Sequence, residues 1–156
     1  MNQYEKLLQT AEKKHIQVIE NYEFQSSRIK GLYCDGIVAL NKSLETEKEK
    51  ACILAEELAH HDTGDGNIIE LSNSNNTRQE ARARFCAYNR LVGLQGIINA
   101  YEAHCHNLHE TADYLEVTEE FLTEALDCYR SKYGLCTRVE QYIIYFEPCF
   151  GVIKML

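Results

Sequence analysis

The sequence predicts an α+β fold, in which a helix and a small β-sheet come first, a mostly helical remainder follows, and a β segment ends the chain. Apolar residues recur at helical spacing near the N-terminus and again from residue 44 onward. Two stretches between these patterns, residues 16–24 and 29–41, are rich in β-branched and aromatic residues. Residues 139–156 have the same strand-like composition.

The first part of the chain predicts one helix followed by strands. The helical stripe consists of Tyr4, Leu7, Leu8 and Ala11. Residues 16–24 and 29–41 then predict two or three strands, because Gly31 and the Asp35-Gly36 pair interrupt them.

The second helix is predicted from a capping pattern and an apolar stripe. Thr46 and Glu49 have the spacing of a capping box, in which both side chains bond to backbone N–H groups at a helix N-terminus. The helix is expected to run to about His61. Its stripe consists of Ala51, Leu54, Ala55 and Leu58.

A loop and a third helix follow. Residues 63–76 are rich in Gly, Asn and Ser, which predicts a long loop. Thr77 with Glu80 then has the spacing of another capping box and predicts a helix start. The apolar stripe of this helix consists of Ala81, Phe85, Tyr88 and Val92.

The C-terminal half predicts short helices and then strands. The helices are expected around residues 96–103, around residues 109–115, and from Thr118 to about Gly134. The stretch 139–156 predicts either two strands joined at a turn or one edge strand, because Pro148 lies near its middle.

Length and composition bound the function. The chain of 156 residues fits one domain, residues 1–156, with a sizeable core. No apolar run reaches the roughly 18 residues of a membrane span, and the first residues lack the apolar core of a signal peptide, so we expect a cytoplasmic protein that does not bind membranes. The seven scattered cysteines predict reduced thiols. A net charge of −8 argues against direct binding of nucleic acid.

The run Glu56-Glu57-Leu58-Ala59-His60 on the second helix is the main candidate for chemistry. Glu56 and His60 lie one turn apart on a face that points away from the apolar stripe, where a metal ion could bridge them. Glu57 lies on the flank of that face, where its carboxylate could act as a general base on a metal-bound water, as in an HExxH site.

Two alternatives stay open for this run. Glu57 and His61 have the same spacing, but that register would place Leu58 where the base is needed. A glutamate and a histidine four residues apart on the polar face of a helix also commonly do no more than face water.

A catalytic zinc needs a third protein ligand, and Glu80 on the next helix is the candidate. The structural alternative is the capping box with Thr77, which would engage the Glu80 carboxylate with a backbone N–H. From the residues alone, the cap is the better explanation.

Three segments carry a family resemblance. They are CILAEELAHH at 52–61, QEARARFCAYNRLVGL at 79–94 and ETADYLEVTEEFLTEALDCYRSKYG at 110–134. Together they resemble the ImmA/IrrE family of metallo-endopeptidases, in the short form found in mobile elements and phages of Gram-positive bacteria. Members have HExxH on one helix and E-x-x-A-N-x-F-A on the next, followed by an apolar run that ends in Pro. The resemblance implies a zincin-like metallopeptidase core.

Carried over by position, the resemblance implies a set of site residues. Glu56 stands where the first His ligand would be, and His60 is the second His ligand. Glu57 is the general base, and Glu80 is the third ligand. The implied cofactor is zinc.

The second motif matches in part. Ala83 and Ala87 are its small residues. Arg84 stands at the position of its Asn, Cys86 at that of its aromatic residue, and Gly93 at that of the closing Pro.

Glu56 changes the charge of the implied site. Two carboxylates and one imidazole would neutralise a divalent ion, whereas two imidazoles and one carboxylate leave it positive. A less positive ion lowers the pKa of its water less. Such a site would favour manganese as a harder ion, hold zinc with lower activity, or have lost catalysis.

Two further patterns favour structural roles. His104, Cys105, His106 and His109 have the composition of a soft-metal site, but three consecutive residues cannot converge from one helical face. Residues 110–126 have the pattern of a helix-turn-helix, whose second helix would read DNA. Phosphates would there meet the acidic side chains of Glu119, Glu120, Glu124 and Asp127, so core helices are the better explanation.

The leading hypothesis is a metal-dependent endopeptidase with Glu57 as general base. The resemblance implies that its substrate is a helix-turn-helix repressor of the same mobile element or phage. The alternative is a catalytically inactive binding module of the same fold, which grips the repressor without cutting it. A DNA-binding regulator comes third, because the chain is acidic.

Overall fold

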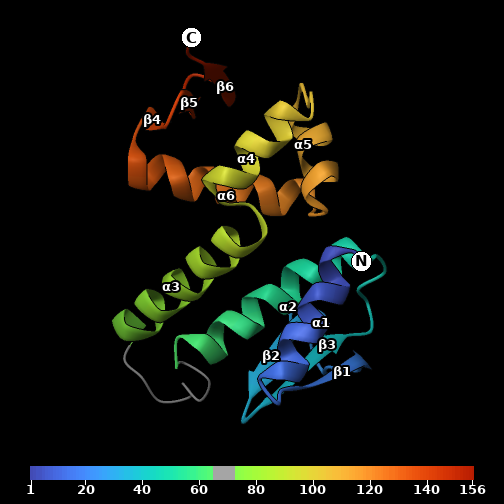
Figure 1. Cartoon of the computed structure of the whole chain (residues 1–156). Coiled ribbons are helices and arrows are strands. Elements are labelled where there is room, and N and C mark those ends of the chain that lie inside the picture. The colour runs from blue at the N-terminus through green and yellow to red at the C-terminus, as the bar shows by residue number, and fades with distance from the viewer. Residues whose placement is uncertain (65–72) are drawn as a thin grey trace. The chain divides into compact units, whose positions relative to one another are not determined.

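Helices and two small sheets alternate along the chain, which confirms the predicted α+β class (Figure 1). The structure is a computed structural model that describes residues 1–64 and 73–156, with residues 73–76 described by their backbone alone. The chain divides into two units, Met1–Ala87 and Tyr88–Leu156. The prediction of one domain over residues 1–156 stays a prediction.

The first unit places two helices on one face of a three-stranded sheet. Strand β3 is central, parallel to β1 and antiparallel to β2. Helices α1 and α2 contact each other and cover the face that carries the buried Val38 and Leu40 of β3 (Figure 1). The elements are α1 (Gln3–Lys13), β1 (Gln17–Tyr22), β2 (Gly31–Cys34), β3 (Ile37–Asn41), α2 (Glu47–Asp62) and the first part of α3 (Asn73–Leu91).

Helix α2 forms as the sequence predicts. The hydroxyl of Thr46, its N-cap, accepts a hydrogen bond from the backbone N–H of Glu49 at 3.1 Å. The helix ends at Asp62, one residue after the expected His61. All four residues of the predicted stripe, Ala51, Leu54, Ala55 and Leu58, are buried. This burial fixes the rotation of the helix and leaves its acidic residues and histidines on the other faces.

The predicted start of the third helix is wrong. Helix α3 already begins at Asn73, and residues 65–72 of the predicted loop 63–76 lie outside the described residues. Thr77 is therefore in the second turn, where the backbone N–H of Glu80 bonds to a carbonyl four residues earlier. The capping box of Thr77 and Glu80 does not form. Ser and Asn favour helix N-termini as well as loops, which is why composition misplaced this boundary.

The second unit combines three helices with an antiparallel sheet in the order β4-β5-β6. The second unit also contains the C-terminal end of α3, from Tyr88 to Leu91. There the Tyr88 ring packs edge-on against the ring of Phe121. The elements are α4 (Gly93–Glu102), α5 (Leu108–Leu115), α6 (Glu119–Tyr133), β4 (Cys136–Val139), β5 (Tyr142–Tyr145) and β6 (Gly151–Lys154).

The C-terminal strands confirm one of the two predicted arrangements. Strands β5 and β6 form a pair with Pro148 in the connection between them. Strand β4 was not predicted. It joins β5 through a tight turn at Glu140, whose φ is 55°, and such turns are usually signalled by Asn or Gly.

The segment with a helix-turn-helix pattern is a core element. Thr118 caps α6 by accepting the Phe121 N–H at 3.0 Å, and the helix ends at the predicted Gly134. The side chains of Leu115, Val117, Phe121 and Leu122 are buried, which supports the structural explanation.

The structure bears on two predictions from composition, the state of the cysteines and the presence of membrane-spanning helices. All seven cysteines are free thiols. Within residues 1–64 and 73–156, no helix combines the length and the apolar character needed to cross a membrane.

Candidate active site

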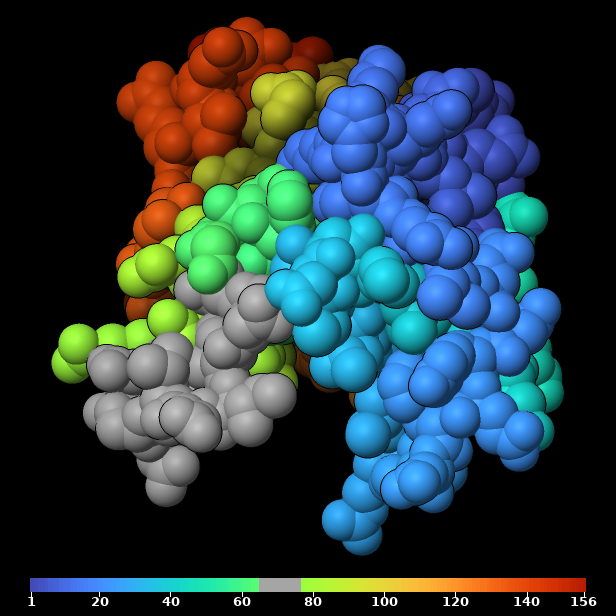
Figure 2. Space-filling view, turned by 90° about the horizontal axis from the view of Figure 1, so that it is seen from below, coloured from blue at the N-terminus to red at the C-terminus, as the bar shows by residue number. Residues whose placement is uncertain are grey.

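Helix α2 presents its polar residues on two adjacent faces. Glu57 and His61 face strand β2, whose Tyr33 contacts both of them. Glu56 and His60 share the next face, and His60 meets Glu80 of α3 there. Figure 2 shows the light-blue β2–β3 segment beside the green C-terminal end of α2. In the Glu56/His60 register, the histidine lies beside Glu80, which also acts electrostatically on Glu57. The choice between the two registers stays a prediction.

His60 and Glu80 are two candidate metal ligands that the structure brings together. Their Nε2 and Oε1 atoms are 3.5 Å apart. Two ligand atoms bound at about 2.0–2.1 Å to a tetrahedral zinc are roughly 3.3 Å apart, so the pair fits one ion. The His60 side chain is 15% exposed and that of Glu80 is 49% exposed, which leaves the pair open on the Glu80 side.

Glu57 lies in an environment that favours its protonated form. Its partial burial, and then the nearby carboxylates of Glu56 and Glu80, raise the pKa of Glu57 to about 7. A hydrogen bond from the backbone N–H of Tyr33 acts in the opposite direction. A general base works best when its pKa lies near the working pH. Glu57 is therefore suited to accept a proton and release it again.

Strand β2 approaches α2 so closely that glycine is required at the contact. A Cβ atom on Gly31 would lie 2.5 Å from Cγ2 of Ile53 and 3.3 Å from Cγ of Glu57. Contacts below 3.0 Å force a neighbour to move, so a side chain at this position would push the strand off the helix. The close packing also restricts the Glu57 side chain.

Glu56 does not complete a three-ligand set. In the described part of the chain, no three His, Cys, Asp or Glu side chains are gathered closely enough to hold a metal ion. After burial, the nearby carboxylates of Glu56 and Glu80 are the next causes that raise the pKa of Glu57. Imidazole and carboxylate donors suit zinc and manganese. The chemistry of the His60 and Glu80 side chains therefore suits a metal ion, and their role as ligands stays a prediction.

The buried carboxylate predicts a pH effect on the metal-free protein. The folded-state pKa of Glu57 is raised from 4.5 to about 7, so folding favours the protonated form and stability falls as the pH rises through this range. Between pH 5 and pH 8 we expect the wild type to lose roughly 2 to 3 kcal/mol of unfolding free energy that Glu57→Gln retains. Urea unfolding of both proteins in chelator measures this. Equal losses would contradict the assigned environment of Glu57.

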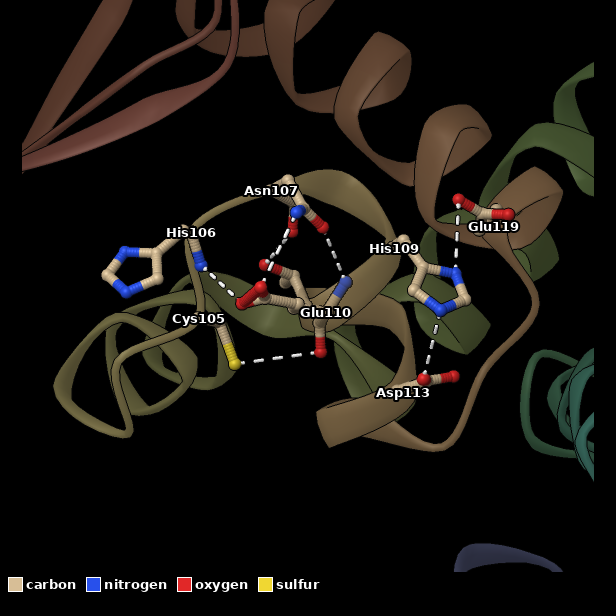
Figure 3. Close-up of polar contacts among 8 residues, drawn as sticks. Cys105, His106, Asn107, His109, Glu110, Asp113 and Glu119 are labelled. Carbon is tan, nitrogen blue, oxygen red and sulfur yellow. Dashed lines mark hydrogen bonds and ion pairs between the residues drawn. The ribbon is translucent and has the colours of Figure 1, made fainter.

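The residues around Asn107 form the N-terminal cap of α5 (Figure 3). Glu110 accepts the backbone N–H of His106 at 3.0 Å, and its own N–H donates to the Asn107 side chain at 2.8 Å. The Cys105 thiol donates to the Glu110 carbonyl at 3.6 Å. The imidazole of His106 points away from these groups in Figure 3.

His109 is occupied by carboxylates. Its Nε2 lies 3.3 Å from Asp113 and its Nδ1 lies 3.7 Å from Glu119. Both ring nitrogens therefore face acidic groups of α5 and α6 (Figure 3). This arrangement ties the two helices together and turns His109 away from Cys105.

Comparison with protein families identifies the chain. The family model Peptidase_M78, described as IrrE N-terminal-like domain, matches residues 11–127, a range that includes all of α2 and α3. The chain belongs to the IrrE N-terminal-like family. Neither the curated proteins nor the solved structures gave a match. As a member of this metallopeptidase family, the IrrE N-terminal-like chain is expected to use a metal cofactor and to act on protein substrates.

Two of the three departures from the motif of the IrrE N-terminal-like family fall on exposed positions of α3. Ala83 and Ala87, the matching small residues, are buried. Arg84 and Cys86, the two replacements, are exposed. The helix therefore keeps the buried positions of the motif.

At Gly93, the backbone adopts a conformation that the proline of the family motif could not adopt. Its φ of 66° is inaccessible to proline, and its backbone N–H donates to the Tyr129 hydroxyl at 3.2 Å. The Tyr129 hydroxyl in turn donates to Asn89 at 2.9 Å. Both observations explain why glycine replaces the motif's proline in this IrrE N-terminal-like chain.

Sequence reasoning missed Tyr33. The alternation in β2 could have placed its side chain on the same sheet face as Gly31. Tyrosine is common in strands, however, and only the folded structure shows that α2 covers this face.

Proposed function

We propose that this chain is a metal-dependent endopeptidase that cleaves a helix-turn-helix repressor of a mobile element or phage, in the cytoplasm and as one metallopeptidase domain. The observation that carries the proposal is the partly buried carboxylate of Glu57 on α2. On the adjacent face of the same helix, His60 lies beside Glu80 of α3. This arrangement supplies a general base next to two metal donors, in a chain of a metallopeptidase family. Family membership supports the metal and the protein substrate, and the motif resemblance supports the repressor.

In this proposal, His60 and Glu80 hold the ion, with Glu56 as the third ligand. Zinc is the proposed ion, with manganese as the alternative because two carboxylates favour a harder metal. When bound, the ion supplies Lewis-acid chemistry that polarises the scissile carbonyl.

Glu57 moves the protons of the reaction. Its carboxylate takes a proton from the attacking water as the oxygen forms its bond to the carbonyl carbon. It then gives this proton to the amide nitrogen as the C–N bond breaks, so the products are a carboxylate and an amine. A pKa near 7 suits both steps, and the Tyr33 N–H orients the carboxylate that performs them.

The experiment uses the repressor encoded beside this chain as substrate. Wild type loaded with zinc or manganese should cut it at a defined peptide bond, read by mass spectrometry, whereas Glu57→Gln should not. Cleavage that survives in Glu57→Gln would contradict the mechanism.

The alternative is a catalytically inactive module that binds the repressor. The observation that favours it is Glu56, which stands at a His position and is not gathered with His60 and Glu80 among the described residues. It predicts that intact repressor is captured with the same affinity by wild type and by Glu57→Gln, and that neither protein cuts it.

Restoring histidine at the first ligand position should raise activity. In Glu56→His, two imidazoles and one carboxylate would leave a bound ion positive, and such an ion would lower the pKa of its water further. A change of about one pKa unit corresponds to a roughly tenfold higher kcat below the pKa, so we expect this gain at pH 7. The kcat–pH profile of the zinc-loaded variant measures it, with Glu120→His on the exposed surface of α6 as the control. An unchanged or lower kcat would contradict the charge argument.

A further inference from the structure

Tyr33 contacts α2 at two points that lie one helical turn apart. Its backbone N–H donates to the carboxylate of Glu57. Its hydroxyl lies 2.7 Å from Nδ1 of His61, four residues further along the helix. The two rings also meet edge-on, with centroids 5.3 Å apart. One residue of β2 thus holds both the candidate general base and a histidine on the same helix face.

The hydrogen-bond partners define the direction of the Tyr33–His61 bond. The Tyr33 oxygen accepts the backbone N–H of Gly36 at 3.2 Å. The arrangement that satisfies all three groups has the hydroxyl donating its proton to Nδ1 of His61, which places the ring proton of neutral His61 on Nε2. In this arrangement, Nδ1 of His61 accepts the proton of the Tyr33 hydroxyl.

The strand contacts the helix at three successive turns. Gly31 packs against Ile53 and Glu57, and Tyr33 reaches Glu57 and His61. The residues on α2 are spaced by four, so the contacts form a continuous line along one face. Among the described strands, β2 lies at the edge of its sheet and is hydrogen-bonded to β3. The side-chain contact at His61 consequently matters for keeping this strand against the helix.

We propose that Tyr33 is a positioning residue: its bond to His61 holds the Tyr33 N–H on Glu57 and so fixes the orientation of the general base. The inference rests on the proposed function of Glu57. Loss of the hydroxyl leaves the backbone N–H in place, but it frees the strand at the His61 turn. The Glu57 carboxylate then samples orientations that do not point at the attacking water.

The kinetic test compares two tyrosines of the same unit. Tyr33→Phe removes the bond to His61, and Tyr4→Phe removes a hydroxyl that donates to Glu20 from the buried side of α1. With the zinc-loaded protein and the neighbouring repressor, we expect kcat to fall at least about tenfold in Tyr33→Phe with KM unchanged, and to be retained in Tyr4→Phe. Equal kcat in wild type and Tyr33→Phe would overturn the proposal while the peptidase function stands.

A second measurement does not depend on activity. Hydrogen exchange of the residue-33 amide should be about tenfold faster in Tyr33→Phe than in wild type, and unchanged in Tyr4→Phe. Unchanged exchange in Tyr33→Phe would overturn the proposal. If exchange is faster in Tyr33→Phe but the protein does not cut the repressor, the positioning role of Tyr33 would be supported. The proposed peptidase function would then be contradicted.

Discussion

Replacing Glu57 with glutamine is expected to lower kcat for repressor cleavage by at least ~100-fold, the usual contribution of a general acid–base group. Glutamine keeps the shape of the side chain and can still accept the Tyr33 N–H, but it can neither take nor return a proton. The bound metal should be retained, because Glu57 is not a proposed ligand. Initial rates by quantitative mass spectrometry, at equal metal loading, measure the change.

The control for this variant is Glu120→Gln, an exposed glutamate of α6. It removes the same charge from the chain without touching α2. A comparable loss of activity in both variants would show that net charge, and not proton transfer by Glu57, explains the result.

The second large effect is expected at His60. Zinc that binds the folded protein and not the unfolded chain stabilises it by about 2.7 kcal/mol at a concentration 100 times the Kd. We expect this stabilisation in wild type and its loss in His60→Ala, because the remaining Glu80 carboxylate is half exposed and has lost its neighbouring donor. Thermal unfolding with and without zinc measures it.

His106→Ala is the matched control for His60→Ala. His106 belongs to the histidine-rich run at the N-terminus of α5, and its backbone N–H, which the substitution keeps, donates to the Glu110 carboxylate. Zinc should stabilise this variant as it stabilises wild type. Stabilisation lost in His106→Ala and kept in His60→Ala would move the metal site to the other unit.

Local sequence signals predicted the element that carries the chemistry. The Thr46 cap and the apolar stripe of α2 act within a few residues, so spacing alone fixed where the helix starts and which face is buried. The same geometry placed Glu56 and His60 together on a polar face. The Thr118 cap and the end of α6 at Gly134 were predictable for the same reason.

Contacts between distant segments could not be predicted in this way. The start of α3 at Asn73 removed the expected cap of Glu80 and left its carboxylate near His60, 20 residues earlier in the chain. The pKa of Glu57 depends on its burial and on Glu80 of another helix. The contacts of Tyr33 depend on which sheet face α2 covers, and no local pattern of the chain encodes that.

The most direct test of the metallopeptidase proposal is the metal content per chain, measured by inductively coupled plasma mass spectrometry on protein purified without chelator or nickel affinity. The proposal predicts about one zinc or manganese ion per wild-type chain and none in His60→Ala. No bound metal in wild type, even after loading with excess zinc and manganese, would contradict a metal-dependent endopeptidase and leave the inactive binding module as the explanation of this fold.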